Sequence, residues 1–259
     1  MSPHTILILG KELHGIPWES MPCLDGHSVS RLSSLYDLRE RILMMKSPSD
    51  DSVPGFHIPC NTGTYILNPS SDLAKTQSRF EKPLSSLTSW SNIIDRTPSE
   101  AEFCNALTPS SCTGTSSPSP SSSLLLYFGH GSGGQYVRSR RIKRLRLSTS
   151  TTSKSSSASP SSTSCTHTSP ALTPTCNTTL LFGCSSASLR TASEFEPFGT
   201  PKTYLAAGAP ALLGSLWDVT DGDCDAFAGG VLERWGLLEK GACRESEAKK
   251  GGKLSLIHI

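Results

Sequence analysis

Two reactive side chains, His130 and Cys184, each follow an apolar run. His130 is flanked by glycine on both sides after the run 124–128, and Cys184 follows a glycine after the run 180–182. An imidazole can draw the proton from a nearby thiol, and the resulting thiolate is a strong nucleophile. In open α/β sheets, ligand sites lie beyond the carboxyl ends of strands, where both residues are expected. The pattern therefore favours nucleophilic catalysis by Cys184 with His130 as its base.

The reaction that fits this pair is amide hydrolysis through a thioester. After the thiolate attacks, His130 would protonate the leaving amine. The backbone N–H groups of Gly131 and Cys184 are the candidate donors to the tetrahedral oxyanion. Free cysteine is also often an inert core residue, and histidine is often a satisfied structural group. The pattern alone leaves the catalytic and the structural interpretation open.

The glycines around His130 also match a second pattern. The segment 129–134 has the G-x-G-x-x-G form of a dinucleotide-binding loop after an apolar strand. The residues that follow it begin a helix poorly for close packing. About 20 residues further on, only Ser and Thr stand where a ribose-binding acid is needed. Dinucleotide binding is therefore a minor alternative, and we expect no cofactor.

Acidic residues gather directly after the last apolar run, at Asp218, Asp221, Asp223 and Asp225. At the same sheet edge they could bind a basic side chain of a substrate, because a carboxylate pairs bidentately with Arg. The alternative is a solvated loop in which Asp223 or Asp225 caps the last helix. The glycine and glutamate spacing of a calcium-binding EF-hand is absent from this segment.

A dense basic run, 138–146, follows the His130 loop. Such a run can bind nucleic acid, direct nuclear import or contact an acidic peptide, although it is most often a solvated face. Arg138 is the member nearest His130. We assign Arg138 to contacts with acidic residues of a substrate or partner.

Composition narrows the remaining classes of site, partner and cellular location. The nine cysteines are odd in number and irregularly spaced, which favours reduced thiols over a disulfide framework. Cys165, His167 and Cys176 lack the paired spacing of zinc ligands, so no metal site is predicted. A net charge of +2 implies neither nucleic acid nor membrane as an obligatory partner. With neither a signal-peptide pattern nor an apolar run approaching ~20 residues, we expect a cytosolic or nuclear protein.

Apolar periodicity predicts alternating strands and helices. The run 5–9 is typical of a strand buried on both faces, and spacings of three and four over 29–46 favour an amphipathic helix. Ser99 and Glu102 form a capping-box pattern before a short helix. The further predicted strands are 64–67, 124–128, 180–182 and 211–217, and the helices are 100–107, 201–209 and 225–235. This series predicts an α/β layered fold with a mostly parallel central sheet flanked by helices.

Two Ser/Thr-rich tracts interrupt the series, at 108–123 and 148–179. Neither can bury enough apolar surface to offset the entropy of ordering it, so we predict two disordered insertions. They lie within one predicted domain over residues 1–240. Residues 241–259 are predicted to form a disordered tail.

Five ordered motifs make the chain resemble the C-terminal protease domain of separase. They are LYFGHGSGGQY around His130, RIKRL at 141–145, LFGCSS around Cys184, EFEPFGTP at 194–201 and LWDVTD at 216–221. Shorter matches lie before residue 80. The resemblance covers about 5–235 apart from the two Ser/Thr tracts, and it implies a caspase-like layered fold.

The resemblance implies a cysteine endopeptidase that cleaves the kleisin subunit of cohesin after Arg, with a Glu three residues earlier, and so releases sister chromatids at anaphase. His130 and Cys184 match the family's catalytic dyad. Asp225 stands where an acid that binds the Arg side chain is expected, and Asp218 and Asp221 are weaker candidates. A securin-like inhibitor, which occupies the site as a pseudosubstrate, is the implied partner. The implied location is the nucleus and cytoplasm, without membrane or sequence-specific nucleic-acid binding.

The chain also departs from the family pattern. Family members are far longer and carry a large helical N-terminal region. The tract 148–179 widens the separation between His130 and Cys184, and Ala187 stands where Gly is common. Residues 241–259 match nothing expected of the family. These departures favour an alternative function: an inactive separase fragment that binds securin or kleisin peptides without turnover.

Overall fold

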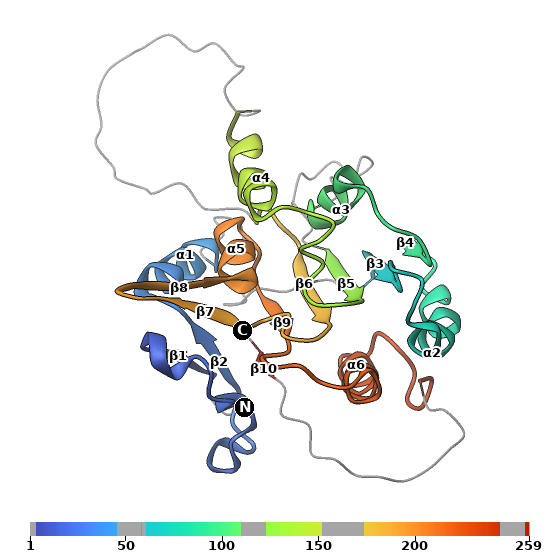
Figure 1. Ribbon diagram of the computed structural model, residues 1–259, viewed down its shortest axis with the longest axis horizontal. Coiled ribbons are helices and arrows are strands. Elements are labelled where there is room, and N and C mark those ends of the chain that lie inside the picture. The colour runs from blue at the N-terminus through green and yellow to red at the C-terminus, as the bar shows by residue number, and fades with distance from the viewer. Residues whose placement is uncertain are drawn as a thin grey trace.

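A computed structural model of the chain describes residues 4–45, 58, 61–109, 123–151, 174–243 and 257–258. Within them, a six-stranded sheet has the order β10-β9-β6-β5-β3-β4 (Figure 1). Its first five strands in the chain run parallel, and the last pairs antiparallel with β9. The strands are β3 (Gly63–Leu67), β4 (Trp90–Ile94), β5 (Leu124–Phe128), β6 (Thr178–Phe182), β9 (Leu212–Gly214) and β10 (Ile257–His258).

Helices cover both faces of this sheet. Every residue of β5 and β6 is buried, and successive side chains of a strand point to opposite faces. On one face Leu126 and Phe128 pack with α2 (Ala74–Ser85) and α6 (Asp221–Arg234). On the other, Leu125 and Tyr127 pack with α3 (Glu100–Leu107), α4 (Ser139–Thr151) and α5 (Thr200–Ala206). The predicted layered α/β fold is confirmed.

Side-chain caps set the starts of two helices. The Ser99 hydroxyl accepts from the Glu102 N–H and the Glu102 carboxylate accepts from the Ser99 N–H, so the predicted capping box and helix 100–107 are confirmed. The last helix begins before its predicted start at 225, because the Thr220 hydroxyl accepts from the Asp223 N–H. The alternative in which Asp223 or Asp225 caps this helix is therefore excluded.

The N-terminal segment differs from its prediction. β1 (Thr5–Ile8) lies outside the central sheet and pairs in parallel with β2 (Val29–Leu32). Its apolar side chains are partly exposed, Ile6 at 42% and Ile8 at 40%, so the predicted doubly buried strand is wrong. The predicted helix 29–46 is wrong over its first residues, because 29–32 extends beside β1. The helix α1 begins only at Leu35 (Leu35–Met45).

A buried charge network anchors this N-terminal unit. The segment between β1 and β2 winds through the 3-10 turns η1 (Lys11–Leu13), η2 (Trp18–Ser20) and η3 (Pro22–Leu24). The side chains of Arg31 and Glu19 are 1% and 3% exposed and form an ion pair. Arg31 also donates to the carbonyls of His14 and Ile16. Directional contacts, rather than apolar packing alone, therefore fix this segment.

The structure also corrects the boundaries of the predicted disordered regions. Residues 110–122 and 152–173 lie outside the described residues, but 174–179 lead into β6 in the core. Cys176 and Asn177 are buried at 0% and 2% exposed, and the Asn177 amide donates to the Ala106 carbonyl. The predicted insertion therefore ends too late at 179, and its start at 148 falls within α4. In the predicted tail, Cys243 is 3% exposed and 257–258 pair with β9, which corrects the prediction there.

The chain leaves β6 through a short hairpin before it returns to the sheet. β7 (Leu189–Ala192) and β8 (Phe195–Gly199) pair antiparallel, and α5 follows directly. The predicted helix 201–209 and strand 211–217 are both present but shorter. Among the described helices, none is long and apolar enough to cross a membrane.

Candidate active site

The structure brings His130 and Cys184 to one edge of the central sheet. β5 and β6 are adjacent and parallel, with Phe128 opposite Phe182, and each reactive residue follows that matched pair by two positions. The Gly129 N–H donates to the Phe182 carbonyl over 3.3 Å, so the two strand ends remain joined. The predicted placement of the pair at a shared carboxyl edge is confirmed by this register.

Glycine allows the two loops to touch. A Cβ atom on Gly183 would lie 2.2 Å from the Gly131 carbonyl oxygen and 2.3 Å from that of Gly129. Backbone atoms cannot give way at such distances, so only glycine fits directly before Cys184. Gly131 has a φ of +56°, in the left-handed region that favours glycine. The glycines flanking the reactive pair therefore serve the close approach of the two loops.

His130 is fixed through its backbone and its ring. The Tyr127 hydroxyl donates to the His130 carbonyl over 2.9 Å. Ring atom Nε2 lies 2.7 Å from Oδ2 of Asp72, in the turn after β3, and the two side chains are 52% and 54% exposed. The sequence patterns assign no role to Asp72, although it lies within a segment that resembles the family. The ring therefore stands at the surface with one nitrogen on a carboxylate.

Cys184 sits at the start of a tightly bonded turn. Its thiol is free, partly buried, and donates to the Val219 carbonyl over 3.0 Å. Ser185 has a φ of +49°, and its N–H donates to the Trp217 carbonyl. The buried Ser186 hydroxyl donates to the Leu181 carbonyl and accepts from the Ser215 N–H. The turn after β6 is thus braced by the segment after β9, and the thiol is exposed enough to meet a substrate.

Other described thiols have a different environment. Burial raises the pKa of Cys176 to about 12, and burial together with the nearby Asp225 carboxylate raises that of Cys224 to about 12. Burial likewise raises the pKa of Cys243 to about 11. Thiols with such pKa values stay protonated near neutral pH and are poor nucleophiles. These three core cysteines are therefore poor candidates for a nucleophile.

The predicted oxyanion donors lie in the turns that flank the pair. Gly131 follows His130 directly, and Cys184 follows β6. The close approach of Gly183 to the Gly131 carbonyl places both turns side by side. The assignment of the Gly131 and Cys184 N–H groups to an oxyanion stays a prediction.

The acidic residues divide between the site and the start of α6. The Asp218 carboxylate accepts from the Ser185 hydroxyl over 2.7 Å, next to Cys184. Asp225 is only 6% exposed, and its Oδ2 accepts from the Thr76 hydroxyl of α2 over 3.0 Å. Asp221 is exposed in the first turn of α6, where a negative charge favours the helix dipole. Their assignment to a pocket for Arg stays a prediction.

The basic run forms most of α4. Its Ile142 is buried against the sheet, whereas Arg140, Lys143 and Arg144 are exposed. Arg138 lies just before the helix, where its side chain is exposed and its N–H donates to the Glu100 carboxylate over 3.4 Å. The run is therefore an amphipathic helix with a solvated basic face. The role of Arg138 toward a substrate stays a prediction.

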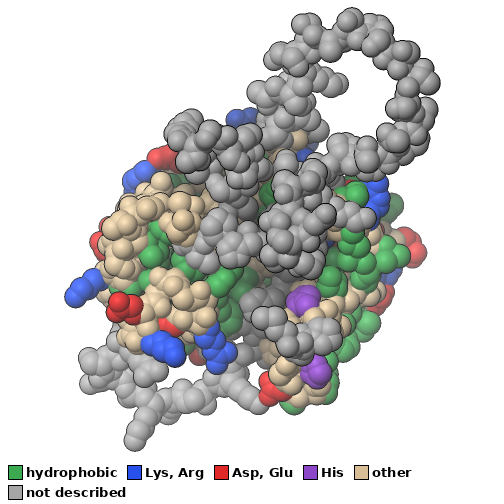
Figure 2. Space-filling model, turned by 180° about the vertical axis from the view of Figure 1, so that it is seen from behind, with side chains coloured by type: hydrophobic (Ala, Val, Ile, Leu, Met, Phe, Trp, Pro, Cys, Tyr) green, Lys and Arg blue, Asp and Glu red, His purple; other side chains and the backbone are tan. Residues whose placement is uncertain are grey.

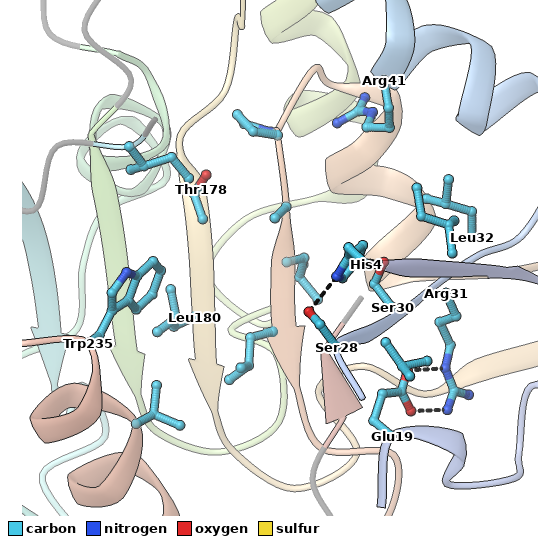
Figure 3. A pocket seen from close by; sticks show the side chains of 18 of the residues that line it. His4, Glu19, Ser28, Ser30, Arg31, Leu32, Arg41, Thr178, Leu180 and Trp235 are labelled. Atoms are coloured by element: carbon cyan, nitrogen blue, oxygen red, sulfur yellow. Dashed lines mark hydrogen bonds and ion pairs between the residues drawn. The ribbon is translucent and has the colours of Figure 1, made fainter. Parts of the chain in front are cut away.

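A cavity of about 1000 Å³ lies away from the reactive pair. Figure 3 shows His4, Ser28 and Arg31 of the N-terminal unit on one side and Leu180 and Trp235 on the other. On the face drawn in Figure 2, hydrophobic side chains also reach the surface. His130, Cys184 and Asp72 are not among the lining residues of this cavity. The site at the carboxyl edge is therefore defined by its reactive groups and not by the cavity.

Fold and site together define a class. The molecule is a layered α/β protein with a mostly parallel sheet, and a thiol and an imidazole lie at the carboxyl ends of neighbouring strands. Comparison with known proteins gives the family. Residues 1–224 match the family model described as "Separin, protease domain". The chain belongs to the separin protease-domain family.

Individual relatives agree with this assignment. The chain is 43% identical to separin of Emericella nidulans over 241 residues and 37% identical to separin of Schizosaccharomyces pombe over 239 residues. These matches cover 92% of this chain but only 9% and 11% of the two relatives. The chain therefore spans about a tenth of their length.

Solved structures show the same fold. Two crystal structures of the Saccharomyces cerevisiae separase–securin complex superpose with TM-scores of 0.68 and 0.65, each at 28% sequence identity. The matches cover 90% and 95% of this chain, and 13% and 14% of those chains. The predicted resemblance to separase and the predicted caspase-like layered fold are thus confirmed.

Proposed function

We propose that the chain is a cysteine endopeptidase of the separase type, with Cys184 as nucleophile and His130 as its base. The observation that carries the proposal is the register of β5 and β6, which places the two residues at equivalent positions on adjacent strands. Membership of a protease-domain family supports the same activity. The proposal needs no cofactor, because a thiolate and an imidazole suffice for amide hydrolysis.

The proposed reaction has two halves. The Cys184 thiol gives its proton to His130, and the sulfur attacks the substrate carbonyl carbon to form a C–S bond. The carbonyl oxygen becomes an oxyanion, for which the Gly131 and Cys184 N–H groups are the proposed donors. When the oxyanion collapses, the C–N bond breaks and His130 protonates the leaving amine. A water molecule then hydrolyses the thioester, with His130 as base, and releases the acid product and the free thiol.

Specificity for Arg is proposed to come from the acidic residues after β9. Asp225 is a buried carboxylate of α6 that accepts from the Thr76 hydroxyl of α2. A carboxylate in a desolvated position can pair strongly with a guanidinium. Asp218, beside Ser185, and Asp221 are the further candidates. Arg138, on the His130 side, is proposed to contact acidic residues of the substrate or partner.

The proposed substrate is the kleisin subunit of cohesin, cut after Arg at sites with a Glu three residues earlier, so that sister chromatids separate at anaphase. The proposed partner is a securin-like inhibitor, since the similar solved structures are separase–securin complexes. The proposed location is the nucleus and cytoplasm. Neither a membrane nor a specific nucleic-acid sequence is required by the proposal.

Cleavage of a Glu-x-x-Arg kleisin peptide by the purified chain tests the proposal. The chain should cleave this peptide but not a matched peptide with Gln in place of Arg. Cys184→Ser should lower kcat by more than about a thousandfold, because a hydroxyl is a far weaker nucleophile at neutral pH. Cys23→Ser is the matched control, since Cys23 is an exposed thiol far from β6 in the chain.

Cleavage that persists in Cys184→Ser would exclude the proposed nucleophile. A wild-type chain that binds the peptide, as measured by fluorescence anisotropy, without cutting it would instead identify a non-catalytic binding module. The Cys184–Val219 hydrogen bond is the observation that favours this second function, because the thiol donates to a backbone carbonyl there.

A further inference from the structure

We propose that Asp72 is a positioning residue that holds the His130 imidazole in the orientation and tautomer that the Cys184 thiol needs. The inference rests on the proposed peptidase function. The direct observation is the contact between His130 Nε2 and Asp72 Oδ2 at 2.7 Å. The acid comes from the end of β3, so three neighbouring strands, β3, β5 and β6, would each deliver one functional side chain.

Asp72 is fixed by a buried asparagine. Asn68, directly after β3, is 2% exposed and has a φ of +51°, a conformation that Asn tolerates better than most residues. Its Oδ1 accepts from the N–H groups of Asp72 and Leu73, at 3.0 and 2.9 Å. Its own N–H donates to the Phe128 carbonyl over 2.9 Å. Asn68 thus ties the turn that carries Asp72 to the strand that carries His130.

Further bonds brace the same turn. The Asn68 amide donates to the Gln77 side chain over 2.7 Å, which fixes the asparagine against α2. Ser71 has a φ of +59°, and its hydroxyl donates to the Asp95 carbonyl over 3.1 Å at the end of β4. These bonds hold the turn against α2 on one side and the end of β4 on the other. The Asp72 carboxylate in this turn is therefore held in position, although its side chain is 54% exposed.

Stability does not explain this arrangement. An ion pair between half-exposed side chains contributes about 0–1 kcal/mol to folding. Such a contact contributes little to the stability of the fold, yet a buried asparagine and a serine, both with positive φ, position it. The gain is orientation, because a carboxylate that accepts the Nε2 proton selects one tautomer of the ring.

The selected tautomer suits the proposed chemistry. With Nε2–H bound to Asp72, Nδ1 carries the lone pair that can accept the thiol proton. The Cys184 thiol donates to the Val219 carbonyl in the structure, so proton transfer requires the thiol to turn toward the ring. A ring that is already fixed leaves only that one side chain to move. The same carboxylate would stabilise the imidazolium that forms after transfer.

Two substitutions test the inference, Asp72→Ala and its near-isosteric partner Asp72→Asn. Both should lower kcat on the Glu-x-x-Arg peptide by about 10–100-fold, at or below the low end of what general acid–base catalysis supplies, while KM changes little. Asn offers no charge and can present N–H to Nε2, which favours the other tautomer. The matched control is Glu239→Ala, which removes an exposed carboxylate after α6, outside the described contacts of the Asp72 turn.

Alkylation of Cys184 by iodoacetamide, followed by mass spectrometry across pH, gives a readout that does not depend on turnover. Both Asp72 variants should shift this pH profile, and Glu239→Ala should not. The inference is overturned if folded Asp72→Ala, or folded Asp72→Asn when the alanine variant does not fold, keeps both the kcat and the alkylation profile of the wild type. If the wild type cuts no peptide but its alkylation profile still depends on Asp72, the peptidase proposal fails and the positioning inference stands.

Discussion

The carboxyl edge of the central sheet and the N-terminal β1–β2 unit are stabilised by different means. In the sheet, side chains such as Leu126 and Tyr127 are at most 1% exposed and pack against helices on opposite faces. In the N-terminal unit, Ile6 and Ile8 are partly exposed, and the buried Arg31 joins the segments through its ion pair and carbonyl contacts. Figure 3 shows this ion pair beside the cavity between the two regions.

This difference relates to function. Burial of apolar side chains, which is not directional, holds β5 and β6 in place. The reactive groups that follow the ends of these strands therefore need not contribute to the core. The three side chains of the proposed site therefore stand on a rigid frame while they stay accessible. In the N-terminal unit the polar contacts themselves hold the segments together, because a buried guanidinium without its partners is costly in free energy.

The largest effect is expected from a substitution in the sheet. Phe128→Ala should lower the free energy of unfolding by about 3–5 kcal/mol, since the ring lies 4.6 Å from that of Phe80 and 4.9 Å from that of Phe182. Phe195→Ala, at 77% exposure, is the matched control and should change it by about 0.5 kcal/mol at most. Urea denaturation measures both. Equal losses would contradict the contrast between the core and the exposed hairpin.

A more local effect is expected from the N-terminal network. Arg31→Met leaves the Glu19 carboxylate buried without its partner. This should lower the free energy of unfolding by about 3–5 kcal/mol, and in the β1–β2 unit alone. Amide hydrogen exchange should therefore speed up over 4–33 while β3, β5 and β6 stay protected. Arg96→Met, in the exposed pair with Glu102, is the control and should leave exchange in the N-terminal unit unchanged. Uniform loss of protection across the sheet would show that the two regions unfold together.

The sequence predicts the sheet better than the N-terminal unit for the same physical reason. The run 124–128 is apolar at every position, and strands buried on both faces show this pattern. Val29 to Leu32 shows no alternation of apolar and polar residues, and Leu32 lies three residues before Leu35, so a helical period can extend across it. The burial of Arg31 depends on Glu19, which no periodic pattern connects to it. Paired polar residues far apart in the chain need the tertiary structure.

The residues of the candidate site also differ in whether the sequence predicts them. His130 and Cys184 are predictable because glycines and apolar runs mark strand ends. Asp72 is not, because its place depends on the Asn68 side chain and on the adjacency of β3 and β5. The sequence signals are the Asn68-Pro69 pair, which ends a strand near the site, and the family resemblance of this segment. Neither shows which acid reaches the ring.

Covalent labelling of Cys184 tests the central claim most directly. An arginyl peptide acyloxymethyl ketone should modify Cys184, and mass spectrometry should find Cys176, Cys224 and Cys243 unmodified at pH 7.5. Their pKa values of about 12, 12 and 11 keep these three thiols protonated until the pH rises toward 11. His130→Ala should slow the modification of Cys184. Modification that spares Cys184, or that proceeds at the same rate without His130, would contradict the account.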